Sequence, residues 1–109
     1  ANSVVAIDCK GKGSKAINCD NSVTVNSGDV TLLATGENYT EIQDDKKSCA
    51  IQADIITVND GTVIAKAYDN ALSAQAININ GGIVNATSTN ADALDTEATQ
   101  TGGWLLTKE

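Results

Sequence analysis

The sequence predicts an all-β fold, a single-chain parallel β-helix (a solenoid) of about four to five coils, each of 21–22 residues and three short strands. Three observations on the sequence lead to this prediction. The first two are that an apolar tetrad recurs along the chain and that a glycine follows each tetrad at a nearly constant distance. The third is composition. The chain has no Phe, Met or Pro and only 3% aromatic residues, so small aliphatic side chains must fill the core. Such side chains suit a thin core built from strands.

The tetrads set the length of the repeat. They read AINC, AIQA, ALSA and ALDT, and they begin at Ala16, Ala50, Ala71 and Ala93. The second apolar position recurs after 34, 21 and 22 residues along this series. The longer first interval predicts one insertion, residues 35–47, which we expect to be a loop. Loops inserted at a solenoid corner often carry the binding surface.

A corner of Asn, any residue and Gly follows each of the first three tetrads. Its residues are Asn26 and Gly28, Asn59 and Gly61, and Asn80 and Gly82. Gly and Asn both accept a positive φ, which a sharp turn needs. We expect the Asn side chains to stack from coil to coil and to bond one another in a bend too tight for water. The corner is therefore predicted to be structural.

Each corner lies between two segments in which apolar and polar residues alternate. These segments are 23–25, 56–58 and 77–79 before the corner, and 30–34, 63–67 and 84–88 after it. Alternation at period two predicts strands with one buried face. We expect each strand to pair in parallel with its equivalent one coil on, so that inward residues stack into a continuous core. A β-sandwich also has many short strands, but it does not require equal spacing of tetrad, Asn and Gly.

Charge and cysteine content narrow the function classes. The net charge of −7 argues against nucleic acid, whose affinity comes from Lys and Arg on phosphates. No apolar run approaches the roughly 18 residues of a membrane span, so we expect no membrane insertion. Cys9, Cys19 and Cys49 have no CxxC spacing and the chain has no His, which gives a zinc site little support. Free cysteines, or one disulfide and one free thiol, both fit.

The run GTVIAKAYDNALSAQAININGGIVNATSTNADALDTE, residues 61–97, resembles bacterial secreted carbohydrate-binding domains built as right-handed parallel β-helices of the pectate-lyase-like type. Those domains repeat units of the form GGxVxVxAxxdGIxAxxxIxIxGGxVxxxA. The resemblance implies binding of polysaccharide, of the plant wall or of an acidic kind, outside the cell or at its surface, with calcium bound at acidic loops. Asp69 and Asp92 match the acidic position of the unit, but the glycine that should follow is missing, which weakens the transfer of calcium ligands.

The sequence places candidate site residues on one strand face and at the corner where the copies differ. One outward position per tetrad forms a polar ladder, and two tyrosines fall near the variable corner, where sugar rings can stack on them. The predicted carbohydrate-binding residues are Asn18, Tyr39, Gln52, Tyr68, Ser73 and Asp95. The predicted calcium ligands are Asp44, Asp45, Asp69 and Asp92, because calcium takes six to eight oxygen ligands.

An enzyme is not expected. Arg and His are absent, and the strand face carries one carboxylate, Asp95, rather than the pair that a glycosidase needs. The favoured function is non-catalytic carbohydrate binding, and the alternative is a structural or adhesive segment of a surface protein. We also expect Trp104 to point outward and residues 1–109 to form a single domain. Its open ends predict either that the domain is part of a longer solenoid or that it associates end to end.

Overall fold

The computed structural model describes residues 4–11, 13–41 and 44–108; for residues 39–41 and 44–46 it describes the backbone alone. No helix occurs in these ranges, so the predicted all-β class is confirmed. No helix long and apolar enough to cross a membrane is found there. The strands are β1 (Val4–Cys9), β2 (Lys15–Asn18), β3 (Ser22–Val25), β4 (Asp29–Ala34), β5 (Tyr39–Glu41), β6 (Asp44–Lys46), β7 (Cys49–Gln52), β8 (Ile55–Val58), β9 (Thr62–Ala67), β10 (Leu72–Ser73), β11 (Ala76–Ile79), β12 (Ile83–Ser88), β13 (Ala98–Gln100) and β14 (Trp104–Lys108).

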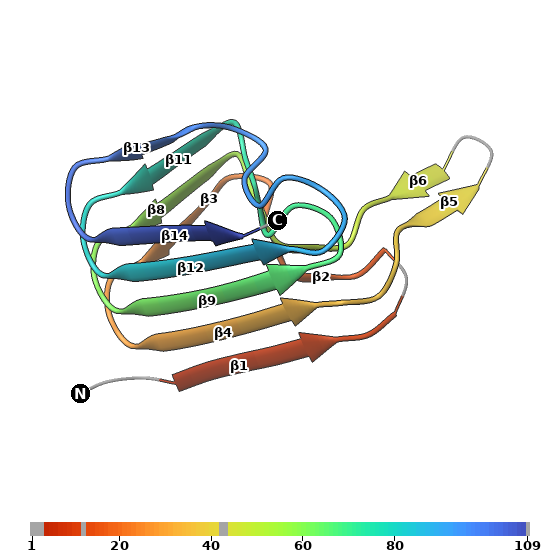
Figure 1. Ribbon diagram of the computed structural model, residues 1–109, viewed down its shortest axis with the longest axis horizontal. Helices are drawn as coiled ribbons and strands as arrows, with labels where there is room; N and C mark the ends of the chain where they lie inside the picture. Colours follow the sequence, from red (N-terminus) through yellow and green to blue (C-terminus); the bar gives the residue numbers. More distant parts are fainter. Residues whose placement is uncertain (1–3, 12, 42–43, 109) are drawn as a thin grey trace.

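Three parallel sheets contain twelve of these strands. The five-stranded sheet has the order β1-β4-β9-β12-β14, the four-stranded sheet β13-β11-β8-β3, and the three-stranded sheet β10-β7-β2. In Figure 1 the five-stranded sheet faces the reader, with β1 at the bottom and β14 at the top. The chain visits the three-stranded, four-stranded and five-stranded sheets in turn, once per repeat, which confirms the predicted parallel pairing of equivalent strands.

The register of the sheets follows the sequence repeat. Ile51 pairs with Leu72 in the three-stranded sheet, and Leu72 forms an isolated parallel bridge with Leu94. The four-stranded and five-stranded sheets keep the same step, for example from Val63 to Val84. A one-residue slip would turn every inward side chain outward, so the alternating pattern fixes this register.

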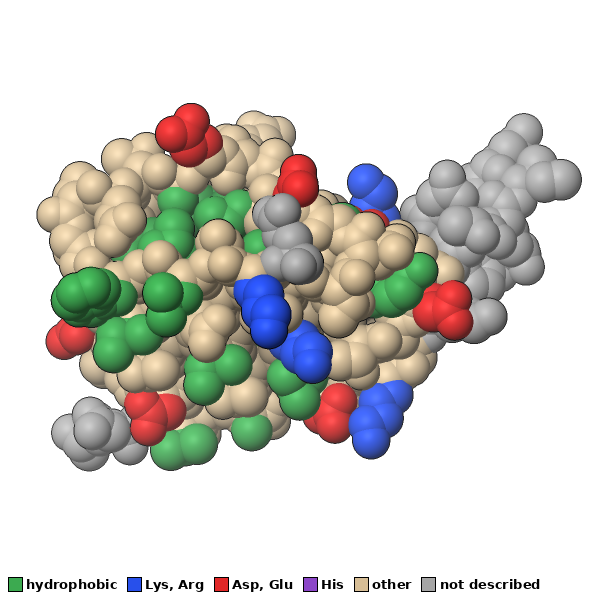
Figure 2. All heavy atoms as spheres, in the orientation of Figure 1, with side chains coloured by type: hydrophobic (Ala, Val, Ile, Leu, Met, Phe, Trp, Pro, Cys, Tyr) green, Lys and Arg blue, Asp and Glu red, His purple; other side chains and the backbone are tan. Residues whose placement is uncertain are grey.

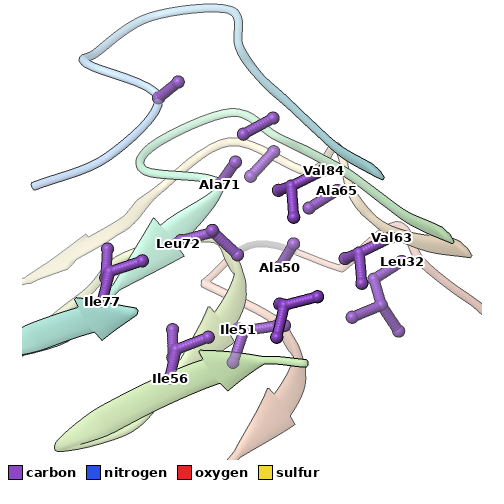
Figure 3. Close-up of a cluster of buried hydrophobic side chains, with 14 of the residues drawn as sticks. Leu32, Ala50, Ile51, Ile56, Val63, Ala65, Ala71, Leu72, Ile77 and Val84 are labelled. Atoms are coloured by element: carbon purple, nitrogen blue, oxygen red, sulfur yellow. The ribbon is translucent and has the colours of Figure 1, made fainter. Parts of the chain in front are cut away.

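The core lies between the three sheets and consists of stacked Val, Ile, Leu and Ala, as Figure 3 shows. In β9 the alternation is complete: Val63, Ala65 and Ala67 are fully buried, whereas Ile64 is exposed. In the five-stranded sheet Val30, Val63 and Val84 form one inward column, whereas Ala65 and Ala86 share the next inward column with Leu32. Every buried side-chain nitrogen or oxygen in the described part of the chain has a hydrogen-bond partner.

The corner glycines carry the turn between the four-stranded and five-stranded sheets. Gly28, Gly61, Gly82 and Gly103 have φ values of 92°, 90°, 78° and 72°. A Cβ atom added to Gly61 would lie 2.4 Å from the carbonyl oxygen of Gly28 in the repeat below. Stacking of repeats at this corner therefore requires glycine for two reasons, the positive φ and the close approach of backbones.

The asparagines form the predicted ladder, but in a different environment. Asn59 Nδ2 donates to Asn26 Oδ1, and Asn80 Nδ2 donates to Asn59 Oδ1, both at 2.9 Å. Thr101 Oγ1 extends the series by donating to Asn80 Oδ1 at 2.9 Å. The expectation that water is excluded from this bend was wrong, because all three Asn side chains are exposed. They point away from the core, and solvent competes for their hydrogen bonds.

The predicted insertion, residues 35–47, leaves the stack at the other end of the five-stranded sheet. It contains an antiparallel pair, β5 and β6, in place of a plain loop. Figure 1 shows this pair projecting from the right of the molecule, opposite the glycine corner at the left.

Candidate functional site

A row of outward side chains lies beside the glycine corner. The first residues of β4, β9, β12 and β14 pair in register, so that Asp29, Thr62, Ile83 and Trp104 follow one another across the sheet. Neighbouring strands are about 4.8 Å apart, so this row extends over about 14 Å. Each residue of the row comes directly after a corner glycine.

The row and the glycines together form an open groove of about 580 Å³. The glycines are its floor because they place no side chain beside the row. The volume lies within the range of roughly 300–1,000 Å³ that is typical of small-ligand sites. The groove is lined by Ser27, Gly28, Asp29, Asp60, Gly61, Thr62, Gly82, Ile83, Gly103 and Trp104.

Trp104 gives the groove an aromatic surface. It is 71% exposed, and Ile83 beside it is 45% exposed, although both are large apolar residues. Leu105 packs against the core, so the prediction that Trp104 points outward is confirmed. Figure 2 shows further hydrophobic side chains on this face of the molecule. Ile64 of β9 and Leu106 of β14 are exposed as well. An exposed indole beside polar groups can stack on a sugar ring while its neighbours bond the hydroxyls.

The other end of the groove is polar and acidic. Asp60 Oδ1 accepts a hydrogen bond from the Gly61 backbone N–H at 2.8 Å, and this bond holds the carboxylate at the groove. Asp29 is exposed and accepts no side-chain hydrogen bond from the residues that the structure describes. Neither carboxylate forms an ion pair with a described Lys, so both remain open to a ligand.

The predicted polar ladder is brought together by the structure. Gln52 pairs with Asn18 on one side and with Ser73 on the other. Asp95 follows: its Oδ2 accepts a hydrogen bond from Ser73 Oγ at 2.6 Å and its Oδ1 one from the Ala74 N–H at 3.0 Å. The Asp95 carboxylate is thus occupied within the protein, and only Asn18 and Gln52 are free of such bonds and exposed.

The variable corner, at the opposite ends of the strands from the glycines, is held by its own hydrogen bonds. Asp69 is only 8% exposed; its Oδ2 accepts from Asn38 Nδ2 at 2.7 Å and its Oδ1 from the Asn70 N–H at 2.8 Å. Asn38 Oδ1 in turn accepts from the Ser48 N–H at 2.9 Å. Both oxygens of Asp69 therefore have partners. This carboxylate ties the start of the insertion to the stack.

The predicted calcium ligands are not brought together in what the structure describes. Asp92 is exposed, whereas Asp69 is buried, and no group of three or more His, Cys, Asp or Glu side chains arranged for a metal occurs among the described residues. The side chains of Asp44, Asp45 and Tyr39 lie outside the described part. Tyr68 is half-buried, and its backbone carbonyl accepts a hydrogen bond from Ser88 Oγ at 3.4 Å. Calcium binding by these residues stays a prediction.

All three cysteines are free thiols, which leaves the first of the two expected alternatives. Cys49 is buried at the start of β7, and burial, assisted by the negative charge of Asp69, raises its pKa from 9.0 to about 11. A thiol with this pKa is protonated at neutral pH and is a poor nucleophile. Cys49 therefore acts as a small core residue.

The repeated corner is predicted from the sequence to be structural, and the groove beside it is not predicted. The missed residues are Ser27, Asp29, Asp60, Thr62 and Ile83. One signal was present: the position after each corner glycine reads Asp, Thr, Ile and Trp, an exposed column that varies while its neighbours repeat.

Fold and groove together define an all-β repeat domain with parallel sheets and an open surface site suited to binding. The chain belongs to the family of carbohydrate-binding domain-containing proteins, whose model matches residues 5–93. No curated protein and no solved structure matches the chain. The family match includes most of the groove but ends before Trp104, so the aromatic end of the groove is identified by the structure alone.

Proposed function

We propose that this domain is a non-catalytic module that binds polysaccharide outside the cell, and that the ligand lies in the groove along the glycine corner. The observation that carries this proposal is the exposed Trp104 at the end of an open groove in a carbohydrate-binding family. The groove crosses four strands without a blocking side chain on its floor. It therefore suits a chain of sugars better than a single one.

We infer that the fold behind this site is a right-handed parallel β-helix. Equivalent strands 21–22 residues apart pair in parallel in three sheets, which the chain visits in a constant order. Right-handed connection between parallel strands is the strong rule in proteins. In such a solenoid the groove runs along the axis, at one corner, and every coil contributes one position to it.

The only tryptophan of the chain makes the test direct. Intrinsic fluorescence is followed while soluble oligosaccharides are added, and retention on insoluble polysaccharides is measured in calcium and in chelator. We expect a shift in Trp104 emission on binding. Retention on insoluble polysaccharide, which does not depend on tryptophan, should show a loss of affinity of about tenfold or more in Trp104→Ala, as for aromatic residues that anchor an interface. Dependence on chelator tests calcium assistance through Asp44, Asp45, Asp69 and Asp92.

Gln52→Ala is the matched control, because Gln52 is exposed on the predicted polar ladder and away from the groove. Its affinity should equal that of the unaltered protein. Loss of binding in Gln52→Ala but not in Trp104→Ala would move the site to the polar ladder. If no polysaccharide is retained under either condition, the carbohydrate-binding proposal fails and a structural or adhesive role replaces it.

A further inference from the structure

The groove has two chemically different ends, and their order is fixed by the strand register. Asp29 and Asp60 belong to the two lower repeats, and Ile83 and Trp104 to the two upper ones. Thr62 lies between them. A ligand that fills the groove must therefore present an apolar ring face at one end and groups compatible with two carboxylates at the other.

Among the residues that the structure describes, no Lys lies at the acidic end of the groove. No Lys is among the residues that line the groove, and the chain contains no Arg. Lys66 and Lys108 lie on the same face of the five-stranded sheet, but Lys66 is four residues beyond Thr62 along β9. Four residues of a strand extend about 13 Å, too far for an ion pair with a ligand held on the groove floor.

Two carboxylates in one groove make its affinity for a sugar depend on the charge of that sugar. A uronic acid at this end would meet Asp29 and Asp60 at close range, and like charges repel. A neutral sugar can bond them through hydroxyls. A protonated amine gains a charge-assisted hydrogen bond and a favourable charge interaction, which are the stronger contacts.

We propose that the groove is built for polysaccharides of amino sugars with free amines: a sugar ring stacks on Trp104 and Ile83, and ammonium groups of neighbouring units bind Asp29 and Asp60. This assignment rests on the proposed carbohydrate-binding function and names its substrate class. It also orients the chain along the groove, because the amines must be in reach of the two lower repeats.

The test compares two glucosamine oligomers of equal length and linkage, one with free amines and one N-acetylated, which differ in that group alone. Galacturonate oligomers of the same length serve as the acidic comparison, although their linkage and ring configuration also differ. Trp104 fluorescence is followed while each oligosaccharide is added to the protein in a mildly acidic buffer, in which the sugar amines are protonated. We expect the free-amine oligomer to bind about three- to tenfold tighter than its acetylated form, as two solvent-accessible ion pairs allow. The galacturonate oligomer should bind weakest.

The net charge of −7 could attract any polycation, so variants must separate the groove from the whole surface. Asp29→Asn combined with Asp60→Asn should remove most of the preference for the free amine and leave binding of the acetylated oligomer nearly unchanged. Asp20→Asn combined with Asp54→Asn is the matched control: it removes the same charge from two exposed positions outside the groove and should keep the preference.

Four outcomes overturn the inference: equal affinity for the two glucosamine oligomers, tighter binding of the acetylated one, the same loss of preference in both double variants, or calcium-dependent preference for galacturonate. In each of these the domain still binds a carbohydrate. Failure of every oligosaccharide to bind or to change the fluorescence would instead refute the proposed function itself.

Discussion

The glycine corner and the variable corner of this domain are built on opposite plans. At the glycine corner the backbones of successive repeats touch, and the side chains beside them point outward and are open to a ligand. At the variable corner the polar side chains point at one another, and Asp69 has both oxygens occupied. The corner whose sequence repeats regularly is thus the one with the accessible surface. The corner whose sequence varies is stabilised by hydrogen bonds among its own residues. Conspicuous variation in a repeat protein can therefore mark local stabilisation as well as a binding surface.

Of the substitutions that test this comparison, one in the floor of the groove should lower the free energy of unfolding most. Gly61→Ala puts a Cβ atom 2.4 Å from the Gly28 carbonyl oxygen at a φ of 90°, so the repeats must separate. We expect the free energy of unfolding in urea to fall by about 2–4 kcal/mol. Ser27→Ala, at an exposed neighbouring position, should change it by less than about 0.5 kcal/mol. Equal stability of the two variants would show that the repeats are not in contact there.

The second largest loss of stability should come from a substitution at the variable corner. Asp69→Ala leaves Asn38 Nδ2 and the Asn70 N–H without an acceptor, and we expect a loss of about 1–3 kcal/mol in the free energy of unfolding. Affinity for carbohydrate, measured by Trp104 fluorescence, should not change. Asp92→Ala is the control, because Asp92 is exposed and its backbone carbonyl, which accepts from Asn70 Nδ2, is retained. Loss of binding in Asp69→Ala without loss of stability would restore this corner as the site.

The pH dependence of stability tests whether Cys49 is buried. Its pKa is about 11 in the folded protein and 9.0 otherwise, so between these values the unfolded chain loses the proton first. The free energy of unfolding should therefore be fully retained below pH 9 and fall as pH rises toward 11, by at most about 2–3 kcal/mol from this group. Cys49→Ala should show a shallower decline over the same window. An alkylating reagent at neutral pH should modify Cys9 and Cys19 well before Cys49, and equal rates would contradict the assigned burial.

The smallest effect should come from the ladder of asparagines. Asn59→Ala removes two side-chain hydrogen bonds, one to Asn26 and one from Asn80, but all three side chains are exposed. We expect a loss of about 0.5–1.5 kcal/mol, because water replaces the lost partners. Asn85→Ala, an exposed position in β12, should be within about 0.5 kcal/mol of the unaltered protein. An unchanged melting temperature in Asn59→Ala would show that the ladder adds nothing to stability.

Local pattern was sufficient for much of the fold. Alternation in 63–67 and 84–88 predicts which residues face the core, and the spacing of the tetrads predicts which strands pair. The same alternation predicts that Trp104 points outward. These features depend on residues close in sequence, or on repeats whose interval can be counted, so a single sequence contains them.

The site depended on features that the sequence does not display. The groove exists because residues without side chains stack, and its hollow becomes visible only when four repeats are placed in register. The role of Asp69 was missed for a related reason: its partner Asn38 lies 31 residues earlier, in a stretch that follows no repeat. The environment of the asparagines was misjudged because a hydrogen-bonded ladder can form on either side of the backbone, and the pattern of Asn and Gly is the same in both cases.

The position after each corner glycine has one further consequence. Each repeat contributes one such residue to the groove, on a backbone whose hydrogen bonds are made to the neighbouring repeats, as in the bonds from the Ile83 N–H to Gly61 and from the Trp104 N–H to Gly82. The scaffold therefore keeps its shape whichever side chain is placed there. A single substitution at one of these positions can therefore change which ligand the groove prefers while the backbone stays the same.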